Sequence, residues 1–225
     1  PVERSEVMGY GVKVEVWGDY ALFSRPELKT ERVSYDVITP SAARGILDAI
    51  LWHPGMRWMI DRIHVLNPIL FTNVRRNELK NKLTKSDMEK MVYSGVVPFQ
   101  ISGDSEEIMQ RASLMLKDVH YVIEAHFVLT DMASPSDTPE KFYNMALRRL
   151  RKGQCFHQPC LGTRECTAHF RIVEGDMPPA IDETRDLGLM LYDLDYSNPE
   201  DIQPMFFRAR LDRGVMEVAN CEVFR

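Results

Sequence analysis

The sequence lacks long hydrophobic runs, and it has no leader-like segment that is both basic and apolar. None of its apolar runs approaches the roughly 18 residues that a membrane-spanning helix requires. We therefore expect a cytoplasmic protein with no membrane partner. With 225 residues, 44% of them hydrophobic, the chain is long enough to bury a large core.

Paired cysteines are also missing. The four cysteines form no C-x-x-C pair and have no histidines at zinc-finger spacing; they are Cys155, Cys160, Cys166 and Cys221. Three of them lie close to His157 in sequence, which leaves a metal site as an alternative. Reduced cysteines on or near a buried loop are the favoured interpretation, because this pattern fits a compartment without disulfides. We expect neither a metal nor a cofactor.

An overall excess of positive charge is absent too, since the net charge is -5. The charge is unevenly distributed, however. Residues 41–90 contain nine Lys/Arg and five Asp/Glu, residues 141–171 contain seven and one, and residues 172–207 contain one and nine. The differences of +4, +6 and -8 predict a basic body that faces a polyanion, followed by an acidic appendage.

Hydrophobic periodicity predicts alternating strands and helices in the first part of the chain. Strands are expected at 11–18, on both sides of Asn67-Pro68 within 56–74, and at 92–101, 119–130 and 167–173. Helices are expected at 39–52, 105–117 and 138–152. Residues 75–90 are expected to form a mobile loop. Thr39-Pro40 and Thr138-Pro139 are typical helix starts, and Gly153 a typical stop.

This order is the β-α-β-β-α-β plan of a ferredoxin-like or RNA-recognition-motif-like fold with insertions. From residue 174 the composition becomes acidic, and two antiparallel strands are predicted on either side of Asp212–Gly214. The predicted class is α+β. We expect a ferredoxin-like domain over 1–173 and a small C-terminal antiparallel β-sheet domain over 174–225.

The helix at 138–152 carries the most informative pattern. Its apolar arc contains Phe142 and Tyr143, and the opposite arc carries the cations Lys141, Arg148, Arg151 and Lys152. A solvated surface helix is the alternative. The glycine-bounded loop that follows, with His157 at its centre, favours phosphate contacts instead. On the first helix, Arg44 and Leu51 fall together outside the apolar arc, so both are expected to face outward.

Several segments together resemble a known family. They are "GDYALF" (18–23), "RIHVLNPI" (62–69), "VRRNE" (74–78), "DVHYVIEAHF" (118–127) and "GQCFHQPCLGTREC" (153–166). In this order they are similar to the CRISPR-associated proteins of the fifth Cas family, in the type I-C (Dvulg) subtype. The resemblance implies metal-independent cleavage of precursor CRISPR RNA beside a repeat hairpin, after which the protein stays on the handle of the mature guide. It also implies partner Cas subunits of a type I-C interference complex, with double-stranded DNA as a further candidate partner.

The chemistry that the resemblance implies is internal transesterification, which requires a general base, a general acid and a cation for the phosphorane charge. In related proteins a tyrosine on the first helix and a Lys-His pair at the start of the later helix serve these ends. Their positions here are Leu51, Lys141 and Phe142, so only the lysine matches.

Three readings remain open. In the first, the chain is an active ribonuclease in which Lys141 stabilises charge and His53 and His157, which can titrate near neutral pH, transfer the protons. Tyr35 and Tyr143 are further candidates for proton transfer. Alternatively it is a catalytically impaired subunit that binds the hairpin and handle, or a nucleic-acid-binding module outside the family. The expected RNA contacts are Arg44, Arg75, Arg76, Lys141, Arg148, Arg151, Lys152 and Arg164, with Tyr20 and Phe23 as stacking platforms for which core packing is the alternative.

Overall fold

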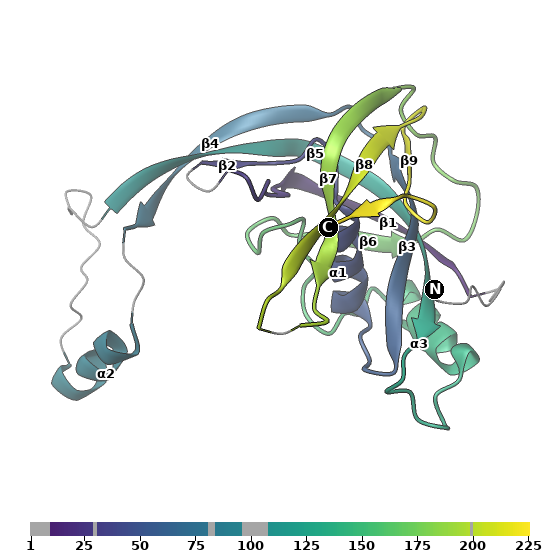
Figure 1. The fold of residues 1–225 in the computed structure, drawn as a ribbon, viewed down its shortest axis with the longest axis horizontal. Coiled ribbons are helices and arrows are strands. Elements are labelled where there is room, and N and C mark those ends of the chain that lie inside the picture. The colour runs from purple at the N-terminus through teal and green to yellow at the C-terminus, as the bar shows by residue number, and fades with distance from the viewer. Residues whose placement is uncertain (1–9, 29–30, 81–83, 96–107, 199) are drawn as a thin grey trace.

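The computed structural model describes residues 10–28, 31–80, 84–95, 108–198 and 200–225, and one long strand, β5 (Ile108–Leu129), organises it. The C-terminal part of β5 lies between β1 (Val12–Ala21) and β3 (Met56–Val65), and its N-terminal part pairs with β4 (Leu70–Leu79) and β2 (Arg32–Val33). The main path of this sheet runs β6-β1-β5-β3-β9, with β6 at His169–Ile172 and β9 at Val215–Glu217 (Figure 1). Except for the short β2, every strand of the sheet pairs antiparallel to its neighbours.

Two helices, α1 (Pro40–Ile50) and α3 (Pro139–Arg151), pack against this sheet. Both begin as the sequence predicts: a threonine side chain caps the first turn, at Thr39 and at Thr138, and proline follows. Their buried faces meet the apolar residues of β1 in one core, which includes Val14, Val16, Ile46, Leu47, Phe142 and Leu150. Among the described residues, no helix has both the length and the apolar character needed to cross a membrane.

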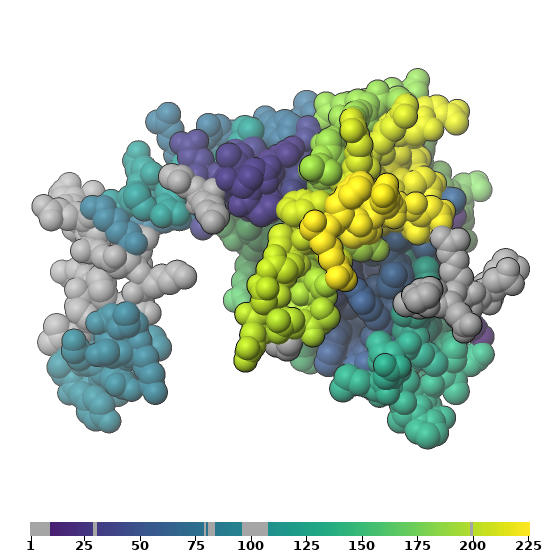
Figure 2. Space-filling model, in the orientation of Figure 1, coloured from purple at the N-terminus to yellow at the C-terminus, as the bar shows by residue number. Residues whose placement is uncertain are grey.

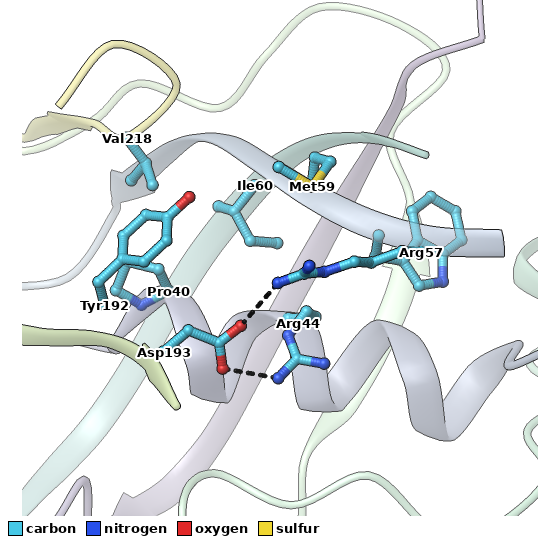
Figure 3. A pocket seen from close by; sticks show the side chains of 9 residues that line it. Pro40, Arg44, Arg57, Met59, Ile60, Tyr192, Asp193 and Val218 are labelled. Atoms are coloured by element: carbon cyan, nitrogen blue, oxygen red, sulfur yellow. Dashed lines mark hydrogen bonds and ion pairs between the residues drawn. The ribbon is translucent and has the colours of Figure 1, made fainter. Parts of the chain in front are cut away.

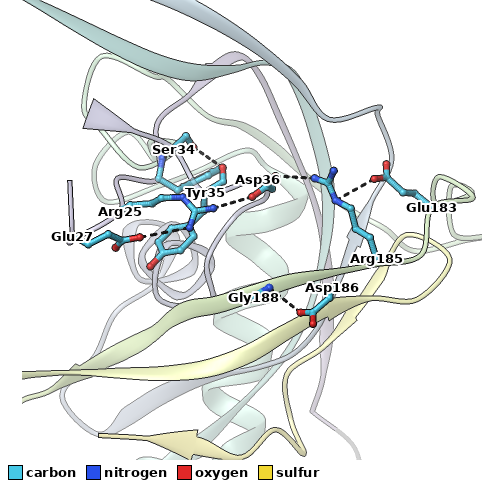
Figure 4. Close-up of polar contacts among 10 residues, drawn as sticks. Arg25, Glu27, Ser34, Tyr35, Asp36, Glu183, Arg185, Asp186 and Gly188 are labelled. Atoms are coloured by element: carbon cyan, nitrogen blue, oxygen red, sulfur yellow. Dashed lines mark hydrogen bonds and ion pairs between the residues drawn. The ribbon is translucent and has the colours of Figure 1, made fainter. Parts of the chain in front are cut away.

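The C-terminal strands form a second, three-stranded antiparallel sheet in the order β10-β8-β7, with β7 at Arg185–Asp195, β8 at Gln203–Leu211 and β10 at Val223–Phe224. β7 runs along α1. Asp36 joins this sheet to the body, because its carboxylate accepts hydrogen bonds from Arg25 (3.0 Å) and Arg185 (2.8 Å) (Figure 4). The predicted antiparallel pairing across Asp212–Gly214 is confirmed at two places, an Asp212–Val215 bridge at the turn and the pairing of β10 with β8, whereas β9 pairs with β3 of the large sheet.

β4 and the first half of β5 leave the body as a two-stranded arm, in which Leu70–Leu79 pair with Ile108–Lys117 (Figures 1 and 2). The helix predicted at 105–117 is therefore wrong for its described part, because cross-strand pairing overrides local helix propensity there. The loop predicted at 75–90 is also wrong, since β4 continues to Leu79 and α2 (Lys85–Ser94) begins with a Thr84–Asp87 capping box. Of the strand predicted at 92–101, the first residues end α2, and residues 96–101 lie outside the described part.

The sheet face that points away from the helices carries paired histidines and carboxylates. Residues of β1 alternate between the two faces, so Glu15 lies opposite to its core neighbours Val14 and Val16. Glu15 is only 3% exposed, and it contacts His120 Nε2 at 2.7 Å and Arg171 Nη2 at 2.8 Å. His126 lies against Asp61 (2.9 Å) in the same manner.

Glu15 predicts a specific pH dependence of stability. Hydrogen bonds from Arg171, and next from His120, hold the pKa of this carboxyl below its usual range against the opposing effect of burial. Its contribution is therefore complete above the ordinary glutamate pKa of about 4.3 and is lost as the pH falls through the lower folded pKa. We expect Glu15→Gln to lower the free energy of unfolding by about 1–3 kcal/mol at neutral pH. The loss should shrink on acidification, measured by urea unfolding of both proteins; a loss independent of pH would contradict a role for the charge.

Candidate functional site

The end of α1 and the start of α3 meet through two loops. The turn after α1, residues 53–55, packs against the loop before α3: Thr130 donates from its backbone N–H to the Gly55 carbonyl (3.1 Å) and from its hydroxyl to the Pro54 carbonyl (2.5 Å). A Cβ atom on Gly55 would lie 2.9 Å from Ala133 Cα, so the close approach of the loops requires glycine here. This packing brings His53 to the N-terminus of α3.

Lys141 lies in the first turn of α3, 46% exposed, with its ammonium 2.7 Å from Oδ1 of Asp137. Asp137 is itself buried and also accepts from the backbone N–H and hydroxyl of Ser134, at 2.9 and 2.8 Å. The hydrogen bond from Lys141 is the main reason that the pKa of Asp137 is held well below its usual range. The carboxylate is therefore ionised and fixes the position of a half-exposed cation.

Phe142 lies close to both Lys141 and His53. Its side chain is fully buried, its ring centroid lies 5.0 Å from that of the His53 imidazole, and Lys141 Nζ lies 5.9 Å from the same ring. His53 Nδ1 accepts a hydrogen bond from the Gly55 N–H (3.0 Å), so the neutral imidazole carries its proton on Nε2. We refer to His53, Asp137, Lys141 and Phe142 as the α3 N-terminal site.

The helical projection predicts that Leu51 faces outward, and this prediction is wrong. The helix ends at Ile50, and Leu51 has extended backbone angles (φ −145°, ψ 111°). The 100° step of a helix therefore does not apply to it, and its side chain turns into the core, where it is 1% exposed. The position at which the family resemblance implies a catalytic tyrosine is thus occupied here by a core leucine.

The loop after α3 returns to the end of α1. The backbone N–H groups of Phe156 and His157 both point to the Ala49 carbonyl, at 2.8 and 3.4 Å, and the Arg149 side chain donates to the Ile50 carbonyl at 2.5 Å. His157 is exposed. The structure therefore brings His157 and His53 to the same end of α1, although no hydrogen bond within the described part links His157 to Lys141.

The predicted basic contacts fall into two groups. Four are exposed and have no ion pair among the described residues: Arg75, Arg148, Lys152 and Arg164. The other four have acidic partners: Lys141 pairs with Asp137, Arg151 with Glu174, Arg76 with Glu165, and Arg44 with Asp48 at 3.3 Å. Arg44 also pairs with Asp193 at 2.7 Å (Figure 3). The exposed group is concentrated at the C-terminal end of α3, in the loop after it and on the arm.

The aromatic candidates also differ from one another. Tyr20 is 44% exposed, as a stacking platform requires. Phe23 is only 3% exposed and its ring packs edge-on against Tyr121, so it is a core residue, which was the alternative for this position. Tyr35 is likewise buried. Two exposed aromatics near the end of α1 were not identified from the sequence, namely Trp52 (63% exposed) and Phe156 (81% exposed).

Asp137 was missed as well, because nothing in its sequence context distinguishes a buried partner of lysine from a polar loop residue. Across the described ranges, no group of three or more His, Cys, Asp or Glu side chains is placed to hold a metal ion. All four cysteines are free thiols.

Comparison with known proteins gives a consistent family. Residues 11–219 match the Cas5d family model, described as CRISPR-associated protein (Cas5). A protein of Mannheimia succiniciproducens named CRISPR pre-crRNA endoribonuclease Cas5d is 47% identical over 217 residues, which cover 94% of this chain and 96% of the relative. A Thermus thermophilus protein of the same name is 43% identical over 224 residues, covering 92% and 90% of the two chains.

Among solved structures, a crystal structure of a CRISPR-associated protein superposes with a TM-score of 0.67 at 25% identity and covers 96% of each chain. The family match and the two relatives each extend over most of the chain. The chain belongs to the Cas5d family of CRISPR-associated proteins.

Proposed function

We propose that this chain is a metal-independent endoribonuclease that binds the repeat hairpin of precursor CRISPR RNA, cleaves it, and stays on the handle of the product within a type I-C interference complex. The activity class is supported by the name that the two relatives share, pre-crRNA endoribonuclease, at 43–47% identity over most of the chain. Repeat RNA and other Cas subunits are the partners that follow from this proposal, with double-stranded DNA as a further candidate.

The body is proposed to be ferredoxin-like. The elements β1-α1-β3-β5-α3-β6 follow the β-α-β-β-α-β order, and their strands lie in the order β6-β1-β5-β3. We keep the proposed division into residues 1–173 and 174–225 because three C-terminal strands form a sheet of their own. One strand of the proposed C-terminal domain does not belong to that sheet, because β9 pairs with β3 at the edge of the large sheet.

The proposed reaction breaks one phosphodiester bond. The ribose 2′-oxygen attacks the adjacent phosphorus, the bond to the 5′-oxygen breaks, and the products are a cyclic 2′,3′-phosphate and a free 5′-hydroxyl. The proton of the 2′-hydroxyl passes to a base, and the departing 5′-oxygen receives a proton from an acid. No atom beyond these groups is needed for the balance.

The observation that carries the chemistry is the fixed ammonium of Lys141. Because Asp137 holds it in place, Lys141 can stabilise the charge that develops on the phosphorane without reorganising during the reaction. His53, whose ring lies beside Phe142, presents an Nε2–H donor, which suits a hydrogen bond to a phosphate or departing oxygen. His157, exposed in the loop after α3, is the candidate for the base.

The test incubates the purified chain with labelled cognate repeat RNA in excess EDTA. We expect one cut beside the hairpin, and no cut in the same RNA with a single 2′-deoxynucleotide before the scissile phosphate, because that RNA lacks the nucleophile. Cleavage of the deoxy-substituted RNA would rule out transesterification. Cleavage that requires an added divalent ion would rule out metal independence.

A second function has its own observation. Leu51 and Phe142 occupy the tyrosine and histidine positions of related proteins, both are buried, and neither has a proton to transfer. A catalytically impaired subunit that only holds the crRNA handle would bind repeat RNA tightly in the same assay and leave it intact.

A further inference from the structure

A polar hollow of about 180 Å³ lies at the edge of β1, beside the residues at which β6 begins. β6 pairs with β1 only from Val14 to Trp17, so the continuation of β1 is not covered by that strand. The preceding loop closes over Gly18, where a Cβ atom would lie 2.7 Å from the Thr167 carbonyl oxygen. The fold therefore shapes this hollow, whose lining residues are Asp19, Tyr20, Glu165, Cys166, Thr167 and His169.

Two of the lining side chains offer flat surfaces. Tyr20 is 44% exposed, and His169 is exposed with its ring stacked on Trp17, at 5.7 Å between centroids and 25° between planes. Trp17 is held in turn by the Arg171 guanidinium, 5.6 Å from its ring, and Arg171 is fixed by the buried carboxylate of Glu15. The plane of His169 is thus supported from behind, as preorganised stacking requires.

The hydrogen-bonding groups of the hollow are mainly acceptors. Glu165 is bound to Arg76, but Asp19 has no hydrogen bond or ion pair within the described ranges. A carboxylate accepts from the exocyclic amino group of cytosine or adenine and repels the corresponding keto oxygen of uracil. The same negative charge disfavours a phosphate group inside the hollow.

Cationic side chains surround the hollow, whereas carboxylates line it. Arg76 binds the lining residue Glu165, Arg164 is the exposed neighbour of Glu165 in the chain, and Lys117 is the cross-strand partner of Tyr20. Lys117 is half-exposed. A nucleotide with its base in the hollow would therefore have its phosphates among positive charges, which is the usual arrangement in single-stranded nucleic-acid sites.

We propose that this hollow binds one unpaired nucleobase that carries an exocyclic amino group, with its ring against Tyr20 and His169 and its amino group on Asp19. The inference rests on the proposed function, because it takes RNA as the ligand. It adds a base-selective subsite that lies on β1 and β6, apart from the α3 N-terminal site.

The experiment compares oligocytidylate with oligouridylate of the same length by fluorescence anisotropy at fixed salt. The two probes have the same charge and almost the same shape, and differ at the amino or keto group. The full chain should bind oligocytidylate about fivefold or more tightly, and Asp19→Asn should remove most of that preference. Tyr20→Ala should weaken oligocytidylate binding about fivefold or more with an unchanged salt slope, because it removes a stacking surface and no charge.

Tyr196→Ala is the matched control, since Tyr196 is 58% exposed on a different part of the surface and should leave both affinities unchanged. Thermal unfolding of each variant establishes that it is folded. Equal affinity of the unmodified chain for both probes, or a full preference retained in Asp19→Asn, would overturn the subsite. Repeat-RNA cleavage is measured on the same preparations: cleavage without a cytidine preference rejects the subsite alone, whereas absence of repeat-RNA binding rejects the proposed function.

Discussion

Replacing Lys141 with alanine should slow single-turnover cleavage of repeat RNA by about 100-fold or more, which is the usual effect of removing one preorganised group that stabilises transition-state charge. The substitution removes the half-exposed ammonium that Asp137 holds at 2.7 Å. Binding of the RNA should weaken much less, because one phosphate contact among several is lost. The measurement is the cleavage rate in EDTA with enzyme in excess, together with the Kd for an RNA that carries the 2′-deoxy substitution.

Lys13→Ala is a closely matched control for this prediction. Lys13 has the same exposed fraction as Lys141, 46%, and it also lies near a carboxylate, Glu124 at 4.0 Å, but on the sheet face away from α3. It should cleave at the unmodified rate. Lys141→Arg, which keeps the charge on a differently shaped group, should recover part of the lost rate. If Lys141→Ala and Lys13→Ala cleave equally fast, Lys141 has no part in the chemistry.

The parts of this site that the sequence predicts are those with local physical causes. The starts of α1 and α3 follow from a threonine cap and a proline at the first helical position, and the end of α3 from Gly153, whose φ is +60°. These features identified Lys141 as a first-turn residue and Phe142 as a core residue. The Thr84–Asp87 capping box was also present in the sequence and would have predicted α2.

Other features depend on contacts between distant residues, and local patterns do not predict them. Residues 108–117 contain good helix formers, yet they form a strand because β4 lies beside them. Leu51 lies one residue past the end of its helix, where a helical projection fails. Arg44 falls outside the apolar arc of α1 as predicted, but the surface that it faces is β7 rather than solvent.

Asp193→Ala should destabilise the chain by clearly more than the loss of an exposed ion pair does. Asp193, whose side chain is 7% exposed, lies between Arg44 at 2.7 Å and Arg57 at 3.4 Å, and so joins α1 and β3 to β7 (Figure 3). Removing one partner of a fully buried pair costs about 3–5 kcal/mol. We expect about 2–3 kcal/mol from urea unfolding, because Asp48 remains as a partner for Arg44 and Arg57 is half-exposed.

The control for this prediction is Asp195→Ala, two residues further along β7. Asp195 pairs with the exposed Arg225 at 3.0 Å, and its loss should destabilise the chain clearly less than the loss of Asp193 does. Arg44→Met then decides between two roles for Arg44. If Arg44 chiefly holds β7 against α1, this variant loses stability, its effect is not additive with that of Asp193→Ala, and the salt slope of repeat-RNA binding does not change. If the salt slope of repeat-RNA binding falls by about one unit instead, Arg44 contacts an RNA phosphate.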